Sequence, residues 1–116
     1  MTSPTRLLDH AEAVLNGHYD LGIRGPRVAA LLTRCAFERW LDQMSAGWAA
    51  SARDHPTTAS QLIVLGALRG TAVGDHAKRL WDRLSQSVHH HAYELQPSAN
   101  DVRYLLVQTR VLMQDS

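Results

Sequence analysis

Three consecutive histidines, His89 to His91, follow a segment of helical pattern that carries Arg83. An imidazole titrates near neutral pH and can serve as a general base or acid, while a guanidinium can hold a phosphate and stabilise the charge that develops on it. On a continuous helix, Arg83 and His90 are seven positions apart and lie within about 20° of the same face. One interpretation of this spacing is metal-free cleavage of an RNA phosphodiester by attack of its own 2′-hydroxyl, in which Arg83 holds the phosphate and His90 meets the ribose in an open groove.

A metal site is a second interpretation of the same histidines. Two ligands on one helix converge on an ion when they are three or four positions apart, whereas neighbouring residues diverge by about 100°. His90 and Glu94 have the required spacing, but the four histidines elsewhere in the chain follow no ligand motif. We therefore expect neither a resident metal ion nor a cofactor.

A structural role is the third interpretation. His91 continues an apolar stripe at helical spacing, so it suits a core histidine that is hydrogen-bonded to the backbone. Tyr93 would pack the corner before Pro97, and His89 would lie in solvent. The residues alone leave all three interpretations open.

Helical periodicity dominates the chain, and no segment shows a convincing strand alternation. Five helices are expected, and they begin at Pro4, Pro26, Pro56, Asp75 and the residue after Ser98. The first helix should end at Asn16-Gly17, and the segment 18–25 is a glycine-rich connector to the second. The fourth helix should run from about Asp75 to the histidines.

Capping residues and glycines mark the other boundaries. The predicted capping residues are Ser3, the Thr58–Gln61 pair and the Ser98–Asp101 pair. Segment 49–55 is polar and small and is predicted to be a loop, and Gly70 and Gly74 flank the break before the fourth helix.

The second helix, from Pro26 to about Gly47, has apolar residues around most of its circumference. Its polar stripe consists of Arg34, Glu38 and Asp42, which recur every four residues. A helix with a single polar stripe is typical of the central member of a bundle. The stripe forms either a surface ion pair between Arg34 and Glu38 or the lining of a cleft, which makes Glu38 a candidate binding residue.

The fourth and fifth helices each have one apolar face. In the fourth, this face consists of Ala77, Leu80, Trp81, Leu84, Val88 and His91. In the fifth, it consists of Val102, Leu105, Leu106, Thr109, Leu112 and Met113. The chain is therefore predicted to be all-α, a single-domain antiparallel helical bundle of four to five helices over residues 1–116.

Composition narrows the possible functions. A chain of 116 residues suits one domain, and its formal charge of +1 excludes a global basic field, so any RNA contact must come from a local patch. The arginines expected to form that patch are Arg79, Arg83, Arg103 and Arg110. No apolar stretch approaches the ~18 residues of a membrane span, and the single cysteine, Cys35, cannot form an internal disulfide. We expect a cytoplasmic protein without a membrane partner.

The pattern of an arginine, a short spacer and a histidine at a helix end, which starts here at Arg83, resembles the motif of the HEPN superfamily (higher eukaryotes and prokaryotes nucleotide-binding). Members of this superfamily are small all-α bundles. The spacer has five residues to His89 and six to His90. The His-Ala-Tyr run that starts at His91 is similar to the ending seen in many toxin members. The string HHHAYELQPS also resembles a set of small actinobacterial HEPN-like proteins.

This resemblance implies a metal-independent ribonuclease that acts as a homodimer on RNA, often controlled by an antitoxin or a regulatory protein partner. Arg83 matches the motif arginine and His90, or His89, the motif histidine, and the pairs of two protomers would meet across a cleft. The candidate binding residues around this pair are Arg79, His91, Tyr93 and Glu38. The residue after the motif arginine is commonly polar in the family, whereas here it is Leu84.

A non-catalytic helical module for dimerisation or regulation is the alternative. Trp40, Trp48 and Trp81 favour it because exposed tryptophans anchor interfaces, although Trp81 on the apolar stripe suits core packing. A bundle that binds a small ligand at the histidine-rich corner is a third hypothesis. A solvent-exposed cleft that contains Arg83 and His90 from two chains favours the nuclease. A His90 turned into the core, or an Arg83 paired permanently with Asp82 or Glu94, favours the module.

Overall fold

The computed structural model describes residues 3–46, 57–88 and 97–114, and none of these residues lies in a strand. The α-helices are α1 (Pro4–Leu15), α2 (Gly25–Ser45), α3 (Thr58–Arg69), α4 (Thr71–Val88) and α5 (Ala99–Gln114), with a short 3₁₀ helix at Gly22–Arg24. The all-α prediction is confirmed. The predicted loop 49–55 and the helix start at Pro56 lie outside the described residues.

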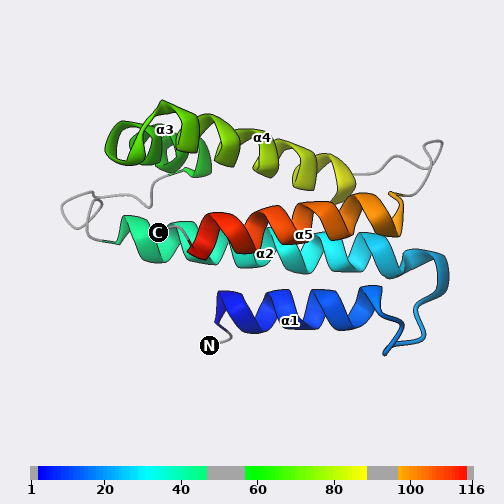
Figure 1. Cartoon of the computed structure of the whole chain (residues 1–116). Coiled ribbons are helices and arrows are strands. Elements are labelled where there is room, and N and C mark those ends of the chain that lie inside the picture. Colours follow the sequence, from blue (N-terminus) through cyan, green and yellow to red (C-terminus); the bar gives the residue numbers. More distant parts are fainter. Residues whose placement is uncertain (1–2, 47–56, 89–96, 115–116) are drawn as a thin grey trace.

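The helices pack in three layers: α3 with α4, then α2 with α5, then α1 (Figure 1). Helix α2 contacts each of the other four α-helices, which confirms that it is the central member. Helices α4 and α5 run in opposite directions, so the last turns of α4 lie at the same end of the molecule as the first turns of α5 (Figure 1).

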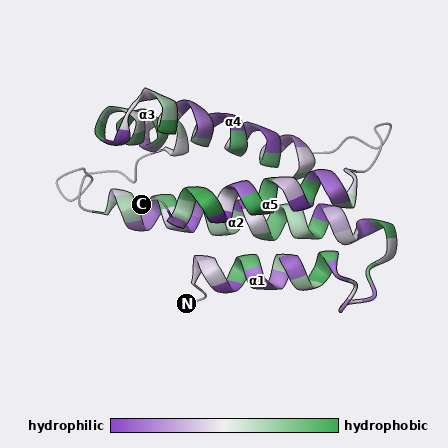
Figure 2. Ribbon diagram, in the orientation of Figure 1, coloured by the Kyte–Doolittle hydropathy of each residue, from purple (hydrophilic) through white to green (hydrophobic). Residues whose placement is uncertain are grey.

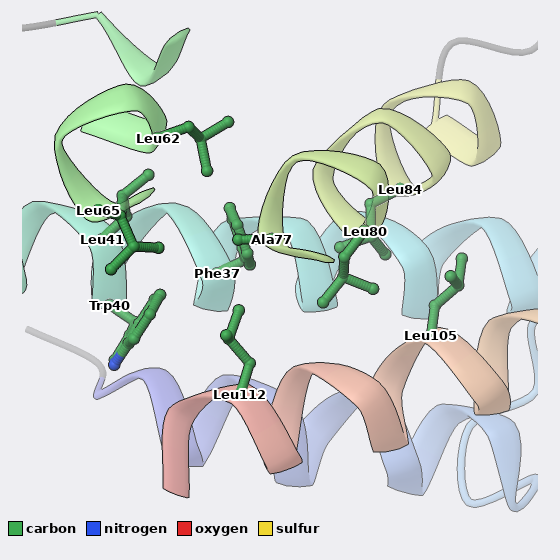
Figure 3. Close-up of a cluster of buried hydrophobic side chains, with 10 residues drawn as sticks. All are labelled: Phe37, Trp40, Leu41, Leu62, Leu65, Ala77, Leu80, Leu84, Leu105 and Leu112. Carbon is green, nitrogen blue, oxygen red and sulfur yellow. The ribbon is translucent and has the colours of Figure 1, made fainter. Parts of the chain in front are cut away.

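Buried apolar side chains form two clusters, one on each side of the middle layer. The first cluster joins α2, α3, α4 and α5, and its rings are Phe37 and Trp40 (Figure 3). The second cluster joins α1, α2 and α5, where small residues such as Ala11, Ala29 and Ala30 let the helices approach closely. Apolar and polar residues alternate along each helix as amphipathic packing requires (Figure 2).

Two helix starts follow the predicted capping chemistry. The Ser3 hydroxyl accepts a hydrogen bond from the backbone N–H of Arg6 at 3.2 Å, and the Ser98 hydroxyl accepts one from that of Asp101 at 3.0 Å. At the end of α1, Asn16 is the C-cap and Gly17 adopts a positive φ of 80°, a conformation that glycine tolerates without a steric penalty.

The start of α3 differs from the prediction by one residue. Thr57, not Thr58, is the N-cap, and its hydroxyl accepts from the backbone N–H of Ser60 at 3.1 Å. Gln61 takes no part in this cap because it is buried, and its amide donates to Asp42 Oδ1 at 2.9 Å and to a buried hydroxyl of α2 at 2.7 Å. The capping-box interpretation of Gln61 was wrong, since acceptors on another helix compete for its amide group.

The break between α3 and α4 also differs from the prediction. Gly70 alone forms it, with a φ of 105°, and α4 begins at Thr71 rather than at Asp75. Gly74 lies inside α4, where a Cβ atom would stand 2.6 Å from the Cα of Gly66 on α3. This glycine therefore permits close helix packing and does not interrupt the helix.

The apolar run at 62–65 is helical, as the sequence predicted. Leu62 and Leu65 are buried in the core, whereas Ile63 between them is 74% exposed. Among the described residues, no helix combines the length and the apolar character needed to cross a membrane.

Candidate functional site

Arg83 lies on the outward side of α4, in its last two turns, and its side chain is exposed. Helix α4 is described as far as Val88. The candidate histidines His89, His90 and His91, together with Tyr93 and Glu94, follow directly in the chain and lie outside the described residues. The structure therefore places the predicted motif arginine but not the motif histidine.

The exposed ring of Tyr104, on α5, is the neighbour of Arg83. The guanidinium carbon of Arg83 is 5.7 Å from the ring centroid of Tyr104, and the tyrosine is 53% exposed. This distance is typical of a cation–π contact. Asp82, adjacent in the sequence, pairs with Lys78 at 3.7 Å, and no ion pair with Arg83 is present among the described residues.

Arg79 lies one turn before Arg83 on the same side of α4 and is also exposed. On α5, Val107 and Val111 continue the exposed side that begins with Tyr104. Val111 lines a hollow of about 310 Å³ together with residues of α4, which shows that the two exposed sides adjoin. We refer to Arg79, Arg83, Tyr104, Val107 and Val111 as the α4–α5 face.

The four arginines predicted to form one patch do not do so. Arg110 reaches α1, where its guanidinium lies 3.0 Å from Asp9 and 3.6 Å from Glu12. Arg103 also turns to α1 and donates to the Leu15 carbonyl at 3.4 Å. The sequence placed these two arginines on one side of their helix, but only the packing shows that this side meets α1.

The fold does not place Glu38 beside Arg83. It pairs with Arg34 at 3.2 Å, and the Arg34 guanidinium lies 5.5 Å from the ring centroid of Trp81 on α4. Trp81 and Arg83 are two positions apart in α4, so they point to nearly opposite sides of the helix. Two residues of the predicted polar stripe, Arg34 and Glu38, thus form an ion pair at the junction of α2 and α4, on the side of α4 away from Arg83.

The tryptophans give little support to an exposed aromatic interface. Trp40 is buried in the core, Trp81 packs partly buried against the same cluster, and Trp48 lies outside the described residues. The exposed aromatic residue that sequence reasoning missed is Tyr104. Its position off the buried stripe of α5 was the available signal, because an outward aromatic side chain is not needed for the core.

The C-terminal end of α4 is held by a residue that the sequence did not single out. Arg27, in the first turn of α2, donates from Nε to the backbone carbonyl of Val88 at 3.0 Å. The last carbonyls of a helix have no partner within it, and a cation beside them is favourable. Arg27 therefore fixes the point from which the chain continues into the histidines.

A groove elsewhere on the molecule does not include the predicted arginines of the site. An apolar groove of about 410 Å³ lies between α3 and α4 and is lined by residues such as Leu62, Ile63 and Trp81, but not by Arg79 or Arg83. Within the described ranges, no group of three His, Cys, Asp or Glu side chains is arranged to hold a metal ion.

Comparison of the chain with protein-family models, with curated proteins and with solved structures gives no match.

Proposed function

We propose that this protein is a HEPN-like, metal-independent ribonuclease in which Arg83 and His90 act on an RNA phosphodiester. The observation that carries the proposal is the state of Arg83, which is exposed, bears no carboxylate partner among the described residues and is located in the last turns of α4. A guanidinium in that state is available to a phosphate. The histidines follow the same helix in the chain, and His90 has the spacing of the HEPN motif.

In this proposal each side chain has its own role in the cleavage reaction. Arg83 binds the scissile phosphate and stabilises the negative charge of the transition state, with Arg79 on the neighbouring phosphate. His90 removes the proton of the 2′-hydroxyl or supplies one to the leaving oxygen, with His89 as the alternative histidine. His91 and Tyr93 remain proposed binding residues, and Glu38 supports Arg34 at the α2–α4 junction rather than binding RNA.

The proposed assembly is a homodimer whose two α4–α5 faces meet across a cleft that holds the RNA, under control of an antitoxin or regulatory protein. A single pair of Arg83 and His90 supplies one histidine, whereas acid and base are two groups. Two facing pairs would supply both. A reducing cytoplasm, in which Cys35 remains a free thiol, is the setting that we propose.

A cleavage assay in EDTA tests the proposal. Purified protein is incubated with a labelled structured RNA beside the variants Arg83→Ala, His90→Ala and, as a matched control, Arg6→Ala, an exposed arginine of α1. We expect cleavage by the wild type and by Arg6→Ala, and a loss of 100-fold or more, on the order of one acid–base group, in the other two.

The same assay distinguishes the outcomes. If cleavage is lost in His89→Ala but retained in His90→Ala, the catalytic histidine is His89 and the proposed reaction is unchanged. Absence of cleavage by every preparation that is folded and dimeric would overturn the nuclease.

A non-catalytic dimerisation module is the second candidate function. The observation that favours it is the apolar character of α5 on the α4–α5 face, where Val107 is 47% and Val111 44% exposed. Exposed aliphatic residues in adjacent turns of one helix are typical of a surface that packs on another copy or on a partner. In this case Arg83 and Tyr104 would contribute to recognition only.

A further inference from the structure

We infer that Tyr104 is a stacking platform for an unpaired RNA base, placed so that the phosphate beside that base meets Arg83. The inference rests on the proposed function and names the kind of RNA that the site takes: a segment with at least one unstacked base, and not a continuous duplex. It also assigns a role to a residue outside the HEPN-like motif.

The position of Tyr104 is the first ground for this role. The core of α5 is complete without it, since Val102, Leu105 and Leu106 fill the buried side of the same turns. Tyr104 instead leaves half of its surface in water. Its hydroxyl makes no hydrogen bond with the described residues, so its contacts within the described ranges do not require a phenol here.

The contact with Arg83 is the second ground. The guanidinium 5.7 Å from the ring centroid restrains both side chains, so a ring surface and a cation are presented together before any ligand arrives. A nucleotide offers the matching pair of groups, a flat base and an anionic phosphate. Single-stranded nucleic acids are bound in this way, by aromatic side chains under the bases and basic side chains along the backbone.

The shape of the surface is the third ground. Arg79 lies one helical turn before Arg83, about 6 Å along α4, so a second cation is available to the next part of the same strand. An exposed ring on a helix cannot reach a base inside a duplex, because both faces of that base are covered by its neighbours. Only an unpaired base can lie on Tyr104.

Binding to short RNAs tests the inference separately from cleavage. The protein carries His90→Ala to prevent turnover, and fluorescence anisotropy measures its affinity for labelled oligo(A), oligo(U) and the oligo(A)·oligo(U) duplex. Because purines stack more strongly than pyrimidines, we expect oligo(A) to bind most tightly and the duplex most weakly. Tyr104→Leu should lower the affinity for oligo(A) about tenfold, and Tyr104→Trp should retain it.

Tyr19→Leu is the matched control, since Tyr19 is 49% exposed in the connector after α1 and should be replaceable without loss. A second readout separates stacking from charge: Tyr104→Leu should leave the slope of log K against log[KCl] unchanged, because a neutral ring releases no counterions. If Tyr104→Leu and the parent protein bind oligo(A) with equal affinity, the stacking role is overturned and the proposed function still stands. Failure of the parent protein to bind any of the three RNAs would overturn both.

Discussion

At the residue scale, the neighbour of an arginine decides what it can bind. Arg83 lies over a neutral ring and has no carboxylate partner among the described residues, whereas Arg110 is held by Asp9 and Glu12 of α1. Both arginines lie off the buried stripes of their helices, and both were predicted to belong to one basic patch. The structure leaves Arg79 and Arg83 as the cations of the α4–α5 face.

This difference predicts how salt affects RNA binding. Arg83→Ala, in the His90→Ala background, should reduce the slope of log K against log[KCl] by about 0.7, the value for one phosphate contact on a single strand. Arg110→Ala should leave the slope unchanged because its charge is already neutralised. Anisotropy titrations with oligo(A) between about 50 and 200 mM KCl measure both slopes. An equal reduction in both variants would contradict the assignment of these two arginines.

At the element scale, α4 packs through its buried residues Ala77, Leu80 and Leu84 and makes one further close contact near each end. Near its start, Gly74 faces Gly66 of α3, and at its end the guanidinium of Arg27 binds the Val88 carbonyl. Arg27 lies in the first turn of α2, where a cation is unfavourable for α2 itself because that end of the helix is positive. The hydrogen bond to α4 offsets this cost, which supports a role of Arg27 in holding the helix that carries Arg83.

Gly74→Ala should destabilise the protein. The new Cβ atom would stand 2.6 Å from the Gly66 Cα, and because that atom is backbone, α3 and α4 must move apart. We expect a loss of about 1–3 kcal/mol in the free energy of unfolding, measured by urea denaturation. Gly66→Ala is the control, since its Cβ would meet the nearest atom at 3.5 Å, an ordinary contact. A Gly74→Ala protein as stable as Gly66→Ala would refute the close packing.

Arg27→Leu should loosen the end of α4 without unfolding the bundle. The lost hydrogen bond leaves the Val88 carbonyl unpaired, so amide hydrogen exchange in the last turn of α4 should become faster, while the unfolding free energy falls by about 1 kcal/mol. If the proposed function holds, RNA cleavage should fall as well, because the histidines follow this turn. Arg24→Leu, at an exposed arginine of the preceding 3₁₀ helix, is the control and should leave exchange in α4 unchanged.

At the scale of the whole molecule, charge and apolar surface are unevenly distributed although the net charge is only +1. The side of α5 toward α1 is neutralised by ion pairs. The α4–α5 face combines two arginines that have no ion pair within the described part of the chain with exposed Tyr104, Val107 and Val111. A protein without a strong overall field relies on such a local surface to attract an anionic ligand. The same surface is the one through which we expect two copies to associate.

Val107→Glu should therefore shift the protein from dimer to monomer, because a carboxylate would have to be buried in an apolar contact without a partner. Sedimentation equilibrium over a range of protein concentrations measures the change in association constant. Leu31→Glu is the matched control, since Leu31 on α2 is 45% exposed, against 47% for Val107, and lies outside this face. A monomeric wild-type protein, or equal dissociation of both variants, would contradict association through the α4–α5 face.

The sequence by itself determined the helices and several of their boundaries, namely the start and end of α1 and the start of α5. The Ser3 and Ser98 caps, the Asn16-Gly17 stop and the apolar stripes of α4 and α5 depend on residues three to seven positions apart, and such local relations are visible in the sequence. The sequence also identified Arg83 as a candidate site residue. The structure places Arg83 on the surface without a carboxylate partner among the described residues.

Only the tertiary structure decided which helix each outward side chain meets. Arg27 and Val88 are 61 positions apart, and Arg110 and Asp9 are 101 apart, so no periodicity links them. The same holds for Tyr104 beside Arg83, for the Gln61 amide of α3 that donates to Asp42 of α2, and for Gly74 as a packing residue. Amphipathic patterns define which side of a helix is buried, but the packing of the helices selects the neighbours, and those neighbours determine which arginines remain available to a phosphate.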